Sequence, residues 1–438
     1  MLFDTTLLEP SSEGFDPIDF RSCLNARGLY SSRQFVLRLN PRIHALVDSL
    51  GTKTVVSVSE IDDETLQAYS TYLHETVHWW QHKGATSGFI RSMLYPSQTH
   101  VNMQFLMDLT ALIGPKKPII AWAEDVQRQN LSRPPNADTL ANNIVNNFMD
   151  TQFYLALTYK PALATEIYKN IYFECAGHSF HIAYDHVIAA LKGSIDPQMA
   201  IFPNASNWEN EFLALRAQRA EGYYYETPIR LAPVGLLHIF EGQARFIQLQ
   251  YLSFARGGMT LREAKEAKLL DGEYGKAFSI FLMMTKSDEP KHIDDPLVAL
   301  FMLICDLSVN PTAGFPSQIT DFHSFYLDVD PGVRFAFLCR AVATHHPKLR
   351  TSIKSYSRDE YLEAVSLLSD ACGYEAPMRA LELIAGWETK QSEISLLMEE
   401  HRTFEFGPPN LAIRVLLAEF IEFCKDKLDA LAKKYHAA

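Results

Sequence analysis

The stretch Thr71-Tyr72-Leu73-His74-Glu75-Thr76-Val77-His78-Trp79-Trp80 contains a His-Glu-x-x-His motif in a sequence that favours a helix. Side chains four residues apart lie one above the other on a helix, so His74 and His78 can bind the same metal ion. Glu75 lies near that face, where it can take a proton from a water that the ion activates. The motif therefore predicts a helix that carries a metal site.

The helix around the motif has clear end signals and is predicted over residues 62–83. Ser59 and Asp62 are candidate N-caps, and acidic residues fill the first turn. Basic residues suit the last turn, and Gly84 follows where a left-handed cap is expected. One side of this helix is mostly apolar, at 100° per residue, and carries Leu66, Tyr69, Leu73, Thr76 and Trp80. We expect that side to pack on the core, and the histidines on the opposite side to face another element.

The strand signal is confined to the N-terminal part of the chain, at 34–40 and 53–59. From about residue 88 onward the pattern is mostly helical, and 358–402 and 410–435 have the periodicity of amphipathic helices. We therefore predict a mainly α (α+β) fold with a small N-terminal antiparallel sheet packed on the motif helix. Breaks in the pattern divide the chain into three predicted units, 1–110 with the motif helix, 111–255 with the third ligand, and the helical region 256–438.

The composition is that of an ordinary globular protein, with 47% hydrophobic and 21% charged residues. A net charge of -12 and the absence of a basic run argue against a nucleic-acid partner. The longest apolar run, 297–305, is too short to cross a bilayer, and the N-terminus lacks a secretory signal. The cysteines are scattered, which predicts free thiols and a cytoplasmic protein: Cys23, Cys175, Cys305, Cys339, Cys372 and Cys424.

The motif resembles the zincin metallopeptidases, because residues 71–80 match the extended pattern of that family at every position. The metzincin branch would need a glycine at 81 and a histidine at 84, where this chain has Gln81 and Gly84. That branch is therefore excluded. His82 lies about 12 Å along the helix axis from His74, too far to share an ion, so we expect a capping or supporting role for it.

The third ligand is predicted on a downstream helix, where His238, Glu241, Arg245 and Gln248 form one polar stripe among apolar residues. A buried polar stripe needs partners, and a metal ion would satisfy Glu241. The segment Glu241-Gly242-Gln243-Ala244 resembles the Glu-Gly-x-Ala pattern of the gluzincins, in which a downstream helix provides the glutamate ligand. The alternative is an ordinary ion pair between Glu241 and Arg245.

A second polar set lies on another predicted helix and consists of Glu174, His178, His181 and Asp185, all on one face. Three interpretations stay open for this set. It can be a second metal site, a support for the first site, or a buried polar network.

The gluzincin resemblance implies a zinc-dependent metallopeptidase that binds one Zn²⁺ per chain and acts on a protein or peptide. His74, His78 and Glu241 would bind the ion, and Glu75 would be the general base. It also implies a donor for the developing oxyanion, for which the candidates near the Glu241 helix are Tyr223, Tyr224, Tyr225, His238 and Arg245. In zincins an edge strand aligns the substrate, and 53–59 is the candidate for that strand.

Two alternatives belong to other classes of protein. The zinc could instead only connect two helices of a binding or regulatory protein, whose helical C-terminal region would contact a partner. Such a site would be closed by a fourth ligand, for which His238 or one of the histidines in 174–185 is the candidate. Glu75 and His78 also form a Glu-x-x-His pair, as in ferritin-like di-iron bundles. Those bundles need a second such pair on a helix, which the sequence does not provide.

Overall fold

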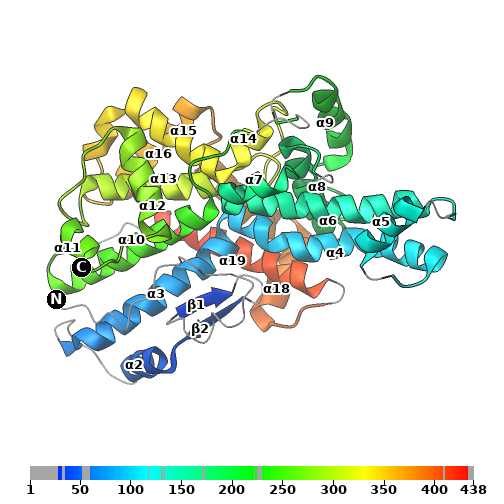
Figure 1. Ribbon diagram of the computed structural model, residues 1–438. Coiled ribbons are helices and arrows are strands. Elements are labelled where there is room, and N and C mark those ends of the chain that lie inside the picture. The colour runs from blue at the N-terminus through cyan, green and yellow to red at the C-terminus, as the bar shows by residue number, and fades with distance from the viewer. Residues whose placement is uncertain are drawn as a thin grey trace.

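The computed structural model describes residues 28–31, 35–51, 60–116, 118–129, 132, 134–169, 173–220, 222–223, 229–407 and 410–432. Within these residues the protein is mainly helical, with one small antiparallel sheet near the N-terminus, as predicted (Figure 1). None of the described helices is long and apolar enough to cross a membrane.

The elements follow one another as a small sheet and a long series of helices. The first part of the chain contains β1 (Gly28–Ser31), β2 (Val36–Leu39), α2 (Pro41–Gly51), α3 (Asp63–Gly84), α4 (Thr86–Ile113), α5 (Ile119–Gln129), α6 (Ala137–Tyr159), α7 (Ala164–Ile167), α8 (Ala176–Ser194) and α9 (Trp208–Ala217). The second part contains α10 (Leu236–Arg256), α11 (Leu261–Glu266), α12 (Glu273–Thr285), α13 (Pro296–Val309), α14 (Phe325–Val329), α15 (Pro331–Thr344), α16 (Arg358–Cys372), α17 (Pro377–Lys390), α18 (Ser392–Thr403) and α19 (Leu411–Ala432). Short 3₁₀ turns lie at Pro161–Leu163, Ala205–Asn207 and Pro347–Thr351.

The sheet pairs β1 with β2 in antiparallel register, with Gly28 opposite Leu39 and Ser31 opposite Val36. The strand predicted at 34–40 is confirmed over its described part, and its partner is β1. The other predicted strand, 53–59, lies outside the described residues. In Figure 1 the sheet and α2 lie on one side of α3, and α10 lies on another.

Helix α3 begins as the sequence predicts and ends for a different reason. Asp62 is its N-cap, and the Asp62 carboxylate accepts a hydrogen bond of 2.8 Å from the Thr65 N–H. The left-handed cap predicted at Gly84 is wrong, because the helix includes Gly84 and leaves it through an extended residue, Ala85. A Cβ at Gly84 would lie 1.9 Å from the ring of Phe423, so the glycine allows α19 to pack closely against α3.

The prediction for the two sides of α3 is correct on one side and wrong on the other. The histidine side faces another helix, α10, as expected, and this contact buries His74 to 2% exposure. On the apolar side Leu66 is fully buried, but Trp80 is 38% exposed. The pattern misleads here because α10 presents polar side chains of its own, so the polar face of α3 is the better-covered one.

Two large hydrophobic cores lie beside α3. The first is built mainly from α10 to α13, α15 and α16, and also takes in Leu66 of α3. The second combines α4, α6, α8, α9 and α14 with α17 to α19. The predicted division at residues 110 and 255 stays a prediction. The described cysteines are free thiols, and all but Cys372 are buried.

Candidate metal centre

Helices α3 and α10 bring three potential metal ligands to one point. His74 and His78 come from α3, and Glu241 comes from the second turn of α10. The His74 Nε2 and His78 Nε2 atoms are 3.1 Å apart. The Glu241 Oε2 atom lies 3.4 Å from His74 Nε2 and 3.3 Å from His78 Nε2. These residues are called the triad below.

The triad fits a zinc ion in both geometry and chemistry. Nitrogen and oxygen ligands bind zinc at about 2.0–2.2 Å in a tetrahedral arrangement, which separates the ligand atoms by roughly 3.3–3.6 Å. The observed separations of 3.1 to 3.4 Å are close to that range. Among the described residues, the buried Glu241 Oε2 has no hydrogen bond and faces the two imidazole nitrogens, which are the atoms that would share a metal ion with it. In the described part of the chain, no fourth histidine, cysteine or carboxylate joins this group.

The electrostatics of the triad favour a cation between the three side chains. Burial lowers the pKa of His74 to about 3. Burial also disfavours the charged form of His78, but the negative charges of Glu241 and Glu75 outweigh it and raise the pKa of His78 to about 9. Burial alone would raise the pKa of Glu241, yet His78 and His74 hold it well below its usual range. A buried carboxylate here needs a positive charge beside it, which a protonated His78 supplies when no ion is bound and a divalent ion would supply in its place.

Glu75 is buried beside the triad and is covered by the small sheet. It is 2% exposed, and its charge acts on His78. A Cβ added to Gly28 would lie 2.6 Å from Glu75 Cγ and 2.9 Å from Glu75 Oε1. The first residue of β1 therefore rests directly on the Glu75 side chain, and only a glycine allows this close approach.

The comparisons with known proteins add no relative. The chain matches no protein-family model, no curated protein and no solved structure. The metal centre is therefore inferred from the geometry of this chain alone.

Two residues beside the triad belong to none of the motifs. Gln81 contacts His78, with 2.8 Å between Gln81 Oε1 and His78 Nδ1. Its position one turn beyond His78, on the same face of α3, is a signal that helical spacing provides. Tyr274 of α12 places its ring 5.8 Å from that of His74, edge to face. No spacing in the sequence links Tyr274 to the motif, because its position depends on how α12 packs against α10.

The remaining histidines and the arginine near the triad have other partners. His82 is buried, and its Nδ1 lies 2.9 Å from the His78 carbonyl oxygen, which fits the supporting role expected for it. His238 Nε2 lies 2.8 Å from Glu273 Oε2, and its Nδ1 accepts from the Gly235 N–H. The guanidinium of Arg245 lies 3.9 Å from the centre of the Tyr274 ring and donates to Gln248. The structure therefore gives Arg245 contacts other than the ion pair with Glu241 that the sequence left open.

The second polar set forms a network around α8 and does not reach the triad. His178 Nδ1 lies 3.1 Å from the Asp150 carboxylate, and Arg216 Nε lies 2.7 Å from Glu174 Oε1. His181 stacks on the ring of Phe212, with 4.3 Å between the ring centres. Burial raises the pKa of Asp185 to about 6, and the charge of Glu209 adds to this effect. The name α8 cluster is used below for Glu174, His178, His181 and Asp185 together with Asp150.

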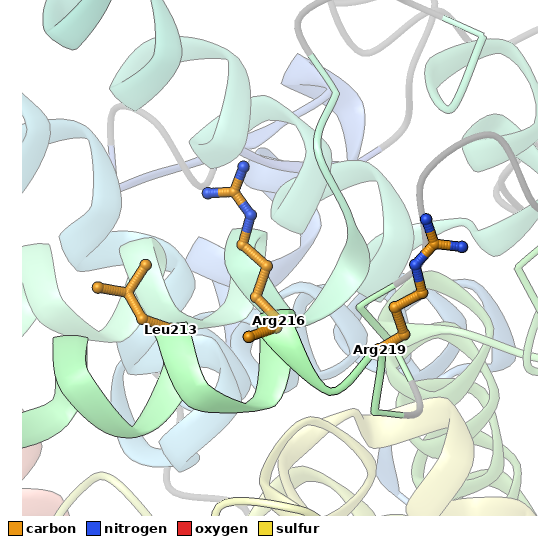
Figure 2. Close-up of a pocket in the computed structure, with 4 residues that line it drawn as sticks. Leu213, Arg216 and Arg219 are labelled. Carbon is orange, nitrogen blue, oxygen red and sulfur yellow. The ribbon is translucent and has the colours of Figure 1, made fainter.

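The tyrosine candidates lie elsewhere or outside the described residues. Tyr223 packs against Gly177 of α8 and Phe212 of α9, in the second core. Tyr224 and Tyr225 lie outside the described residues. A surface pocket of about 340 Å³ near this region is lined by Leu213, Arg216, Ala217 and Arg219. Figure 2 shows Arg216 on the last turn of α9 and Arg219 on the segment that follows it. None of the residues that line this pocket belongs to the triad.

Proposed function

We propose that this protein is a zinc-dependent metallopeptidase of the gluzincin type. His74, His78 and Glu241 hold the zinc, one ion per chain, and Glu75 is the general base. The observation that carries the proposal is the convergence of three ligand atoms, from two helices, beside the glutamate of a His-Glu-x-x-His motif. A small antiparallel sheet that packs on the Glu75 side of α3 supports a zincin-like arrangement around that motif.

The chemistry follows from the positions of the side chains. When bound, zinc supplies a Lewis acid that polarises the scissile carbonyl and lowers the pKa of water. The Glu75 carboxylate removes a proton from the attacking water, whose oxygen bonds to the carbonyl carbon. Glu75 then delivers that proton to the leaving nitrogen as the carbon–nitrogen bond breaks. The Gly28 contact holds the Glu75 side chain in one place, so less of its conformational entropy is lost during the reaction.

The same geometry favours an enzyme over a structural zinc site. Structural sites are closed by a fourth protein ligand, whereas catalytic sites leave one position for water and substrate. Among the described residues the group has three members, and the side chain of Glu241 is 20% exposed. His238, a candidate for the fourth ligand, instead contacts Glu273, with 2.8 Å between His238 Nε2 and Glu273 Oε2. A di-iron centre would need a second Glu-x-x-His pair next to the first. The α8 cluster cannot supply that pair, because among the described residues it does not join the triad.

The test is the variant Glu75→Gln, which keeps the size and hydrogen-bonding reach of the side chain but cannot accept the proton. Zinc content and melting temperature should match those of the wild type. Hydrolysis of a fluorescent casein or of a mixed peptide library should fall by about 10²–10⁴-fold. Unchanged turnover in Glu75→Gln would contradict the catalytic role. A wild type that binds zinc but cleaves none of these substrates would favour the structural-zinc alternative.

A further inference from the structure

Gln81 connects the two helices that supply the triad. It lies on α3 one turn beyond His78 and is 5% exposed. Its Oε1 lies 2.8 Å from His78 Nδ1. Its Nε2 donates to the carbonyl oxygen of Phe240 at 3.1 Å and to Gln243 Oε1 at 2.9 Å. Phe240 immediately precedes Glu241, so one amide side chain contacts a ligand on α3 and the backbone next to a ligand on α10.

The hydrogen bonds of Gln81 fix the tautomer of His78. A backbone carbonyl oxygen only accepts, so the amide nitrogen of Gln81 must face Phe240, and the amide oxygen must face His78. Because that oxygen also only accepts, His78 Nδ1 must carry the proton. When the ring holds a single proton, Nε2 is therefore the nitrogen with the free lone pair. Nε2 is also the atom that faces His74 and Glu241.

The two histidines of the triad differ in how they are held. Among the described residues, His74 Nδ1 has no hydrogen-bond partner, and the ring is positioned by contacts with the His78 and Tyr274 rings. His78 Nδ1 has a hydrogen bond to Gln81, whose amide nitrogen in turn donates two hydrogen bonds to α10. The polar partner of a metal-binding histidine orients the ring and adjusts its basicity. In the triad this support is concentrated on His78.

We propose that Gln81 is the positioning residue of the metal centre: it sets the tautomer and ring orientation of His78 and ties them to the position of Glu241. This inference rests on the metal site of the proposed function, but not on the peptidase activity. Gln81 then controls metal affinity without touching the metal.

The experiment measures Zn²⁺ affinity by competition with a chromophoric chelator, on the full-length protein. Gln81→Met keeps the length of the side chain but loses all three hydrogen bonds. It should weaken zinc binding by about 10–100-fold. Gln81→Glu keeps an acceptor for His78 Nδ1 but cannot donate to the Phe240 carbonyl oxygen, so it should recover part of this loss. The matched control is Gln243→Met, which removes one contact between the helices and leaves His78 oriented; its zinc affinity should stay within about twofold of the wild type.

The outcomes separate the positioning role from helix docking. Equal losses in Gln81→Met and Gln243→Met, or no recovery in Gln81→Glu, would show that Gln81 only joins the helices and would overturn the proposal. Wild-type affinity in Gln81→Met would overturn it as well. A wild type that binds no zinc would contradict the metal centre itself. A wild type that binds zinc but lacks peptidase activity would contradict only the proposed function.

Discussion

The triad and the α8 cluster have similar composition but opposite arrangements. Both combine histidines with carboxylates that come from more than one segment of the chain, and both lie largely out of solvent. In the α8 cluster the central charges have their own partners, His178 with Asp150 and Glu174 with Arg216. In the triad three ligand atoms from two helices point at one another, and the Glu241 carboxylate oxygen lies within 3.4 Å of both imidazole Nε2 atoms.

This difference separates a polar network from a candidate metal site. A network is complete when each buried group has a partner, so an added ion would have to break existing pairs. Convergent ligand atoms keep a carboxylate buried beside two imidazoles, so they need a positive charge among them, which an ion or a protonated histidine can supply. The direction in which side chains point is therefore more informative than their residue types.

The largest expected effect comes from removing the acidic residue of each group in turn. Glu241→Ala deletes a ligand and should lower zinc affinity on the order of 10³-fold. Glu174→Ala removes the contacts with Arg216 and His178, which are partly exposed, and should cost about 1 kcal/mol of stability with no loss of zinc. Metal analysis after dialysis and a urea denaturation curve measure the two effects. Loss of zinc in Glu174→Ala, with zinc retained in Glu241→Ala, would reverse the assignment of the third ligand.

A smaller effect is expected at the contact between β1 and Glu75. Gly28→Ala places a methyl group 2.6 Å from Glu75 Cγ, so the carboxylate must shift. Peptidase activity should fall on the order of tenfold to a hundredfold, because a small misplacement of a general base is costly. Zinc content should not change. The matched control is Ser31→Ala at the other end of β1, which should keep wild-type activity. Full activity in Gly28→Ala would contradict the positioning of Glu75 by the sheet.

The smallest effect belongs to the α8 cluster and depends on pH. Burial raises the pKa of Asp185 to about 6 in the folded protein, from an ordinary value of 3.8. The stability that this shift contributes is fully present below the unfolded pKa and is lost as the pH rises through the folded pKa. Asp185→Asn removes the dependence. Its free energy of unfolding, relative to the wild type, should be about 1–2 kcal/mol larger at about pH 7.5 than at about pH 4.5. Equal differences at both pH values would show that Asp185 is not perturbed.

The sequence predicts the parts of the site that depend on local helical geometry. The helix around the motif, its Asp62 cap and the common face of His74 and His78 follow from spacing and capping alone. A polar stripe and a family resemblance predict Glu241 as the third ligand, and the structure has it beside both histidines. The metal itself stays a prediction.

Other features depend on contacts between segments that are distant in the chain. The contact of Gly28 with Glu75 and the hydrogen bond from Gln81 to Phe240 arise only when the sheet and α10 have docked on α3. The local context of Gly84 predicts a helix cap, whereas the close approach of Phe423 is what requires a glycine there. Periodicity shows which residues share a face, but it does not show what covers that face.

The most direct test of the metal centre is the metal content of the purified full-length protein. Elemental mass spectrometry gives the number of metal ions, which is divided by the measured protein concentration. A catalytic site formed by His74, His78 and Glu241 predicts one zinc ion per chain, and His74→Ala combined with His78→Ala should reduce it to background. Two iron or manganese ions per chain, or zinc that persists in that double variant, would contradict the account.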